Sequence, residues 1–126
     1  MKDFQVGYAA VNINPPLGIG ISGYYVPRFA KGFLDDLEAS ALAVSCKDKQ
    51  LVLISVDNCF IDTELIHRYR IAIEQATGIL KEHIMITSTH THTGPLVAPT
   101  VFFEAEETII KRYADFLEER LMDVVK

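Results

Sequence analysis

Two short apolar segments separated by an amphipathic one leave this chain few possible folds. Residues 51–57 and 84–89 have the length and composition of strands. Between them, over 62–77, apolar side chains recur at the spacing of one helix face: Leu65, Tyr69, Ala72, Ile73 and Ala76. Two strands joined through a helix lie parallel in one sheet. The sequence therefore predicts an α/β fold, with a mixed β-sheet that contains a βαβ unit and helices packed on the sheet.

The remaining segments extend this unit at both ends. Val6–Ile13 is a predicted strand, ended by two prolines that lack the amide hydrogen a ladder needs. Glu38–Cys46 and Leu51–Asp57, separated by the polar residues 47–50, are predicted to form a β-hairpin. Near the end of the sequence, Glu106–Val125 is a predicted helix, with an apolar stripe made of Ile110, Tyr113, Leu117, Leu121 and Val124.

Two further expectations follow from the apolar pattern. Residues 84–89 are mostly apolar, which predicts a strand buried on both faces. No linker or internal repeat interrupts the chain, so we expect one domain over residues 1–126.

The composition limits the kinds of partner that the protein can bind and the cellular compartment in which we expect it. A net charge of −5 without a basic cluster argues against nucleic acid. No apolar run approaches the ~20 residues of a membrane span, and the chain opens directly into a strand, so we expect no integral membrane segment and a cytoplasmic location. Cys46 and Cys59 flank a strand about 20 Å long, too far apart for a disulfide, and are expected to be free thiols.

The motif Ser88-Thr89-His90-Thr91-His92-Thr93-Gly94-Pro95 is the main candidate for chemistry. In an extended backbone, residues i and i+2 point to the same side about 6–7 Å apart, so His90 and His92 are candidates to converge on a metal ion. A pair of surface histidines on a loop is the alternative. Asp57 ends the neighbouring parallel strand and is expected at the same sheet edge, as a ligand or as a partner of an imidazole. Its alternative role is that of a turn aspartate before the helix.

The long irregular segment 17–32 is a candidate binding loop. Its glycines allow mobility, and its aromatic residues, Tyr24 among them, offer contact area for a ligand. Plain packing over the end of the sheet is the alternative.

Several motifs in order give the chain a resemblance to a known family. They are the segment Val6–Gly18 with its Asn14-Pro15-Pro16, then Ser22-Gly23-Tyr24, then Val52–Asp57, then Thr89–Pro95. This order resembles the start of the neutral/alkaline non-lysosomal ceramidase family and covers the chain as far as about Pro95. The resemblance implies the N-terminal part of a zinc-dependent hydrolase that cleaves a linear amide, in this family the N-acyl bond of ceramide.

The resemblance also implies roles for individual residues. His90 is the expected zinc ligand, and His92 the neighbour that binds zinc or polarises the substrate. Asp57 matches a strand-end aspartate of the family, which makes His92 and Asp57 the expected catalytic residues. Tyr24 and Asn12 are expected to contact a small amide or lipid-like substrate, although Asn12 stands where the family usually has Asp.

The same comparison implies an incomplete site. The family supplies a later histidine, a glutamate and a tyrosine as further ligands, and these 126 residues contain no counterpart of that later part. We therefore expect a zinc site that is incomplete and inactive alone. We also expect a homo-oligomer, with Phe102, Phe103, Ile109 and Phe116 as the contact surface. Two other functions remain open: an unrelated metallohydrolase that shares His-x-His, and a non-catalytic module for small-molecule binding or oligomerisation.

Overall fold

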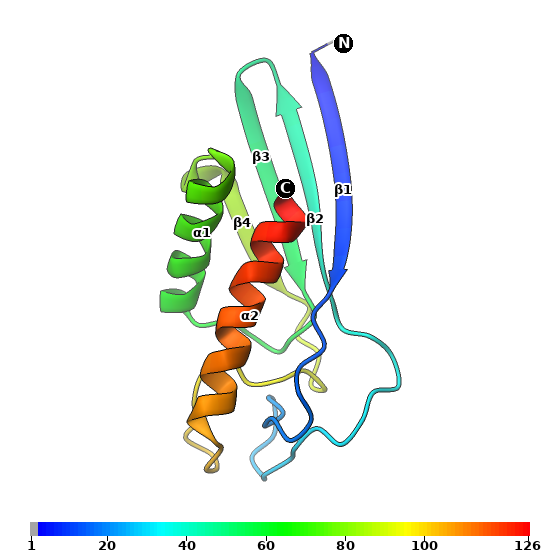
Figure 1. Cartoon of the computed structure of the whole chain (residues 1–126), viewed down its shortest axis with the longest axis vertical. Coiled ribbons are helices and arrows are strands. Elements are labelled where there is room, and N and C mark those ends of the chain that lie inside the picture. Colours follow the sequence, from blue (N-terminus) through cyan, green and yellow to red (C-terminus); the bar gives the residue numbers. More distant parts are fainter. Residues whose placement is uncertain (1–2) are drawn as a thin grey trace.

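A four-stranded sheet with two helices forms the framework of the protein (Figure 1). The computed structural model describes residues 3–126. The strand order is β1-β2-β3-β4, which is also the order along the chain. The elements are β1 (Phe4–Asn12), β2 (Glu38–Cys46), β3 (Lys49–Val56), α1 (Thr63–Thr77), the short 3-10 helix η1 (Lys81–His83), β4 (Ile84–Ser88) and α2 (Glu107–Val125).

The first three strands are antiparallel and the last pair is parallel. β1 pairs with β2 from Phe4↔Cys46 to Asn12↔Glu38, and β2 pairs with β3 through a two-residue turn. Lys47 in that turn has φ +58°, a left-handed angle that tight hairpins use. The predicted turn was two residues too long, because the last two of its four residues pair with β2 as the start of β3.

The predicted βαβ unit is confirmed. β3 and β4 pair in parallel from Val52↔Ile84 to Val56↔Ser88, and α1 connects them. The helix ends at Gly78, whose φ of +81° is readily available only to a residue without a Cβ, and its amide donates to Glu74 O. The mixed sheet and its packed helices are therefore those that the apolar pattern predicts.

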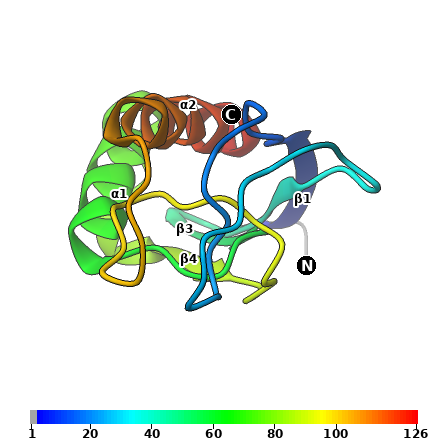
Figure 2. The same cartoon turned by 90° about the horizontal axis from the view of Figure 1, so that it is seen from below.

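Both helices lie on the same face of the sheet (Figure 2). Their stripes meet Val52, Ile54 and Val56 of β3 in one core. All five residues predicted for the α2 stripe are buried, whereas α1 fully buries only Tyr69 and Ile73.

Polar contacts link the helices to each other and to the sheet. The hydroxyl of Tyr69 donates to Ala114 O at 2.8 Å, and that of Tyr113 to Ile13 O at 2.7 Å. At the helix surface, Arg68 bonds Glu118 at 2.6 Å and Asp115 at 2.7 Å. The hydrogen bond with Glu118 is the main cause that raises the pKa of Arg68.

No element covers the opposite face of the sheet within residues 3–126 (Figure 2). The expectation that β4 is buried on both faces is therefore wrong: Ile84 is buried, but the next residue, Met85, is 57% exposed. Alternation along the strands places seven partly exposed apolar side chains on this open sheet face: Phe4, Val6, Tyr8, Leu42, Leu51, Leu53 and Met85.

The surface expected around α2 is smaller than predicted. Phe103 and Ile109 pack in part against the core, whereas Phe102 is 55% exposed and Phe116 is 37% exposed. The larger apolar surface is the open sheet face. In the described part of the chain, no helix is long and apolar enough to cross a membrane.

Candidate metal centre

His90 and His92 lie beyond the end of β4, at the sheet edge where β3 also ends. Backbone hydrogen bonds hold this segment beside the β3–α1 connection: Thr89 N donates to Val56 O and His90 N to Asn58 O, both at 2.9 Å. The sequence predicted an extended backbone here, and this is wrong: β4 ends at Ser88, and His90 has a left-handed φ of +67°. A left-handed residue followed by a turn, rather than a strand, brings the two rings together.

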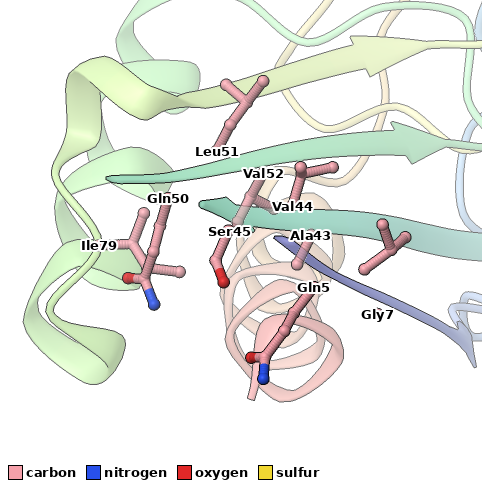
Figure 3. Close-up of a pocket in the computed structure, with 10 residues that line it drawn as sticks. Gln5, Gly7, Ala43, Val44, Ser45, Gln50, Leu51, Val52 and Ile79 are labelled. Atoms are coloured by element: carbon pink, nitrogen blue, oxygen red, sulfur yellow. The ribbon is translucent and has the colours of Figure 1, made fainter. Parts of the chain in front are cut away.

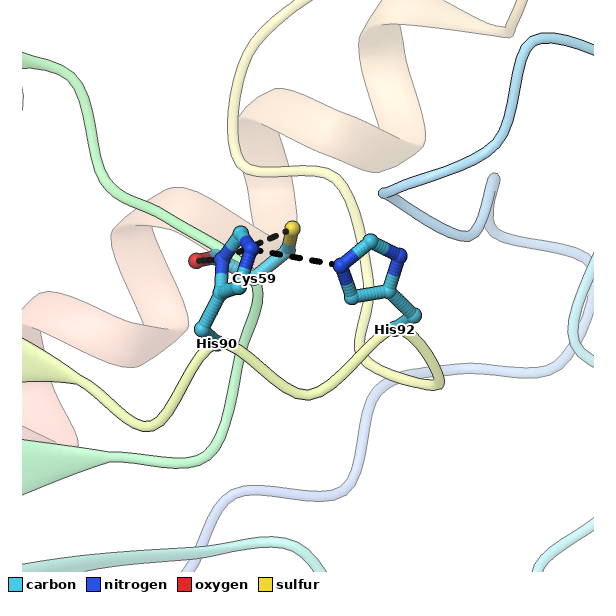
Figure 4. A group of neighbouring side chains, drawn as sticks. All are labelled: Cys59, His90 and His92. Atoms are coloured by element: carbon cyan, nitrogen blue, oxygen red, sulfur yellow. Dashed lines mark hydrogen bonds between the residues drawn. The ribbon is translucent and has the colours of Figure 1, made fainter.

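Each imidazole is oriented by a backbone carbonyl, that of Cys59 for His90 (Figure 4) and that of Gly23 for His92. The Nδ1 atom of His90 lies 2.9 Å from Cys59 O, and that of His92 lies 3.0 Å from Gly23 O. A carbonyl oxygen only accepts hydrogen bonds, so both Nδ1 atoms carry the hydrogen. In the neutral rings, both Nε2 atoms are then lone-pair acceptors.

The two Nε2 atoms face each other at 3.3 Å (Figure 4). Two lone-pair acceptors at this distance repel unless a metal ion or a proton lies between them. A tetrahedral zinc ion with Zn–N bonds of about 2.05 Å holds two nitrogen ligands roughly 3.3 Å apart. The pair therefore fits zinc in both its donor atoms and its spacing.

Gly23 is part of this arrangement. Its φ is +102°, and a Cβ built at this position would lie 2.7 Å from Cγ of His92, closer than such atoms approach. Only glycine therefore combines this backbone angle with the carbonyl that fixes His92. The neighbouring Tyr24 ring meets His92 edge-on at 5.9 Å and carries the Arg28 guanidinium 4.3 Å from its centroid.

The loop that contains Gly23 is bonded directly to the histidine motif. Ser22 N donates to Gly94 O at 3.0 Å and Leu96 N to Gly20 O at 2.8 Å. Gly94 in turn packs on the β3–α1 connection, where a Cβ would lie 2.9 Å from Cα of Asn58. Segments 20–23, 57–59 and 90–96 thus form one connected structure around the two rings.

Cys59 is a member of this cluster that the sequence analysis did not predict. Its side chain is buried, with 4% exposed, and its Sγ lies 3.5 Å from Nδ1 of His90. One ligand atom from each of Cys59, His90 and His92 lies within 4.8 Å of the other two. Cys59 lies just beyond β3, and the histidine motif lies just beyond the neighbouring parallel strand β4. Because the ends of parallel neighbours meet, this position could have predicted that Cys59 lies close to the histidines.

Asp57 and Asn12 lie outside this cluster. The Oδ2 atom of Asp57 accepts a hydrogen bond from Glu38 N at 3.0 Å, which ties the end of β3 to the start of β2. The Oδ1 atom of Asn12 accepts one from Asn14 N at 2.8 Å and shapes the turn after β1. These bonds do not test the substrate roles of the two residues, which stay predictions.

Two hollows lie at opposite ends of the strands. The one at the carboxyl ends, about 870 Å³, is lined by the 27–37 segment, by Ile19 and Ile21, and by Asp57, Thr91 and Thr93. The other, about 270 Å³, lies by the β2–β3 turn and is lined by Gln5, Ser45, Gln50, Ile79 and neighbouring strand residues (Figure 3). The lining of the smaller hollow has no acidic, basic or metal-binding side chain, whereas the larger one is lined by Asp57 and by Thr91 and Thr93 of the histidine motif.

Comparison with known proteins adds to this geometry. No family model and no curated protein sequence matches the chain. Among solved structures, neutral ceramidase from Pseudomonas aeruginosa matches with a TM-score of 0.78 at 17% identity, over 98% of this chain and 21% of that one. The fold is shared with a ceramidase.

A second solved structure agrees with the first. A ceramidase complexed with C2 matches with a TM-score of 0.77 at 18% identity, over 97% of this chain and 21% of the other. The chain thus spans about a fifth of the length of these two proteins.

Proposed function

We propose that the chain is part of a zinc-dependent amide hydrolase, with His90 and His92 as zinc ligands. The observation that carries the proposal is the pair of Nε2 atoms, which face each other at 3.3 Å while both Nδ1 atoms bond carbonyls. The shared fold with neutral ceramidase supports it, because that protein is named for amide cleavage in ceramide.

In the proposed reaction, the residues of this chain hold the metal and bind the substrate. Zinc, when bound, supplies the Lewis acidity that activates water and polarises an amide carbonyl. His90 and His92 would hold the metal through Nε2, and the Nδ1 hydrogen bonds to Cys59 O and Gly23 O would keep the rings in that orientation. His92 is exposed, and we assign Asp57 a substrate contact through Oδ1, because the hydrogen bond from Glu38 N uses Oδ2.

We propose a linear amide with a lipid-like chain as the substrate. The larger hollow combines apolar side chains, among them Ile19, Phe29 and Phe33, with the polar groups of Asp57 and Thr91. Such a lining holds an apolar chain and orients one polar group. Tyr24, at the edge of His92, lies where it can contact the substrate next to the metal. Asn12 is retained as a second contact on the resemblance alone.

We propose that this part of the enzyme needs further protein for turnover. Two imidazoles are fewer than the three protein ligands that a catalytic zinc usually has. The matched ceramidases are about five times as long as this chain. We therefore expect metal binding without amidase activity from these 126 residues.

The open sheet face supports self-association. Its seven partly exposed apolar side chains present on the order of 700 Å², close to the roughly 800 Å² that each partner contributes to a standard interface. We propose that a second copy of this chain covers this face.

Zinc titration tests the metal assignment. Asparagine tolerates a left-handed backbone, so His90→Asn removes the ligand with little strain at φ +67°. We expect the unmodified chain to bind one zinc ion by calorimetry, and His90→Asn to bind it at least about tenfold more weakly. His67→Asn is the matched control, since His67 is exposed on α1. Equal affinity in all three proteins contradicts the proposal.

A further inference from the structure

Arg28 is an exposed basic residue that lines the larger hollow. Within residues 3–126, the hydrogen bonds and ion pairs made by arginine side chains belong to Arg68, Arg70 and Arg120. The Arg28 guanidinium makes neither kind of contact there, so its N–H donors have no acceptor in this part of the protein. Arg28 therefore offers the hollow a positive charge and a planar set of donors that are available to a ligand.

The backbone of Arg28 is anchored to the segment that orients His92. Ile21 N donates to Arg28 O at 2.8 Å, which folds residues 18–30 back on themselves. Gly23, whose carbonyl oxygen bonds Nδ1 of His92, follows Ile21 by two residues. One short segment thus holds both the imidazole and the backbone of the arginine.

The Tyr24 ring fixes where the guanidinium lies. The Cζ atom of Arg28 is 4.3 Å from the centre of this ring, a cation–π contact, and the ring centre is 5.9 Å from that of His92. The guanidinium carbon is therefore at most about 10 Å from the centre of the His92 imidazole, roughly the length of three extended residues. A single small ligand can reach both groups.

The acidic residues of the hollow limit where an anionic group can bind. Three carboxylates line it: Asp35, Asp36 and Asp57. Asp36 already accepts a hydrogen bond from Nδ2 of Asn14 at 2.8 Å, and Asp57 accepts one from Glu38 N at 3.0 Å. Because these carboxylates repel an anion, a negatively charged group of a ligand is favoured beside Arg28, on the side of the hollow that Tyr24 connects to His92.

We infer that Arg28 selects an amide substrate with a carboxylate on the amine side of the bond to be cleaved, that is, an N-acyl amino acid. The inference rests on the proposed function, which places the amide carbonyl at the metal held by His90 and His92. It goes beyond that function because it names the charged group that the substrate carries and the residue that recognises it.

The geometry of such a substrate fits this assignment. In an N-acyl amino acid, one carbon separates the amide nitrogen from the carboxylate, so the two carbonyl carbons are only about 4 Å apart. With the amide at the metal and the acyl chain along the apolar side chains of the hollow, the carboxylate falls within the distance that separates His92 from Arg28. A planar carboxylate also matches the guanidinium through two parallel hydrogen bonds.

Ligand binding tests the inference without any need for turnover. The full 126-residue chain is dialysed to equilibrium against N-decanoylglycine or its uncharged counterpart N-decanoylglycinamide, both below their micelle concentrations, with zinc and with EDTA. We expect the carboxylate to bind at least about tenfold more tightly than the amide under both conditions. Arg28→Gln should remove this preference. Arg112→Gln, which removes an exposed charge on α2, should keep it.

The measurement with EDTA separates the arginine from the metal. A preference that persists in Arg28→Gln and disappears with EDTA means that the carboxylate binds zinc, which overturns the inference and leaves the proposed function intact. Equal binding of the two ligands, or binding of neither, also overturns the inference. A preference that depends on Arg28 in a chain that fails the zinc titration supports the inference and contradicts the proposed metal site.

Discussion

Backbone angles that are rare for ordinary residues hold the two imidazoles in place. His90 has φ +67°, an angle that costs a residue with a Cβ on the order of 1 kcal/mol. Two local hydrogen bonds offset that cost, one from its amide to Asn58 O and one from its ring to Cys59 O. A strained residue at the point where metal-binding groups converge is typical of a functional site.

Gly23→Ala is predicted to disturb the site through His92. The added methyl group would overlap the His92 ring, and φ of +102° is unfavourable for alanine. We expect zinc affinity, measured by calorimetry, to fall by about 10- to 100-fold, as when a partner that orients a ligand is lost. Gly32→Ala is the control, since a Cβ there meets no atom within 4 Å. Equal zinc affinity of the two variants would refute the role of Gly23.

At the scale of the elements, the packing of the two helices can be tested through two buried tyrosines, Tyr69 on α1 and Tyr113 on α2. Burial is the main cause that raises the pKa of both Tyr69 and Tyr113 above the usual value of 10. Above about pH 10 the unfolded chain therefore releases these protons while the folded chain retains them, so the free energy of unfolding falls as pH rises.

The prediction is measured by urea unfolding between pH 7 and pH 11. Tyr69→Phe should lose about 1 kcal/mol at pH 7, because its hydroxyl no longer bonds Ala114 O. It should also reduce the loss of stability above pH 10, since one of the two protons is gone. A slope in Tyr69→Phe as steep as in the unmodified chain would show that Tyr69 does not contribute.

The spacing of apolar residues was sufficient to predict most helices and strands. It was insufficient to predict what packs against them. The α2 stripe was correct in every residue because it meets one core. The burial of β4 was wrong because strand composition does not reveal whether a second layer covers the sheet. The histidine motif predicted the place of the site, but its geometry depends on the Gly23 and Cys59 carbonyls, which lie far away in sequence. Cys59 was expected only as a free thiol, although its place just beyond β3, opposite the motif that follows β4, was a signal for the cluster.

For the molecule as a whole, the open sheet face predicts association. Leu53 lies in its middle, paired with Leu42 and Met85. We expect sedimentation to give a dimer or larger species, and Leu53→Lys to shift it to the monomer because a charge is then placed in an apolar contact. Leu34→Lys is the matched control, since Leu34 is fully exposed in the 14–37 segment. A monomer at every concentration would contradict self-association.

The hydrogen bond from His92 to Gly23 O joins residues 69 positions apart in the sequence. Closing so long a loop is entropically costly before the sheet has formed, so this contact belongs to the late steps of folding. A chain that has formed only the β2–β3 hairpin and α1 has Cys59 in place and neither ring oriented. For the zinc site proposed above, we therefore expect the metal to bind only once folding is complete, and so to stabilise the finished structure over every partly folded one.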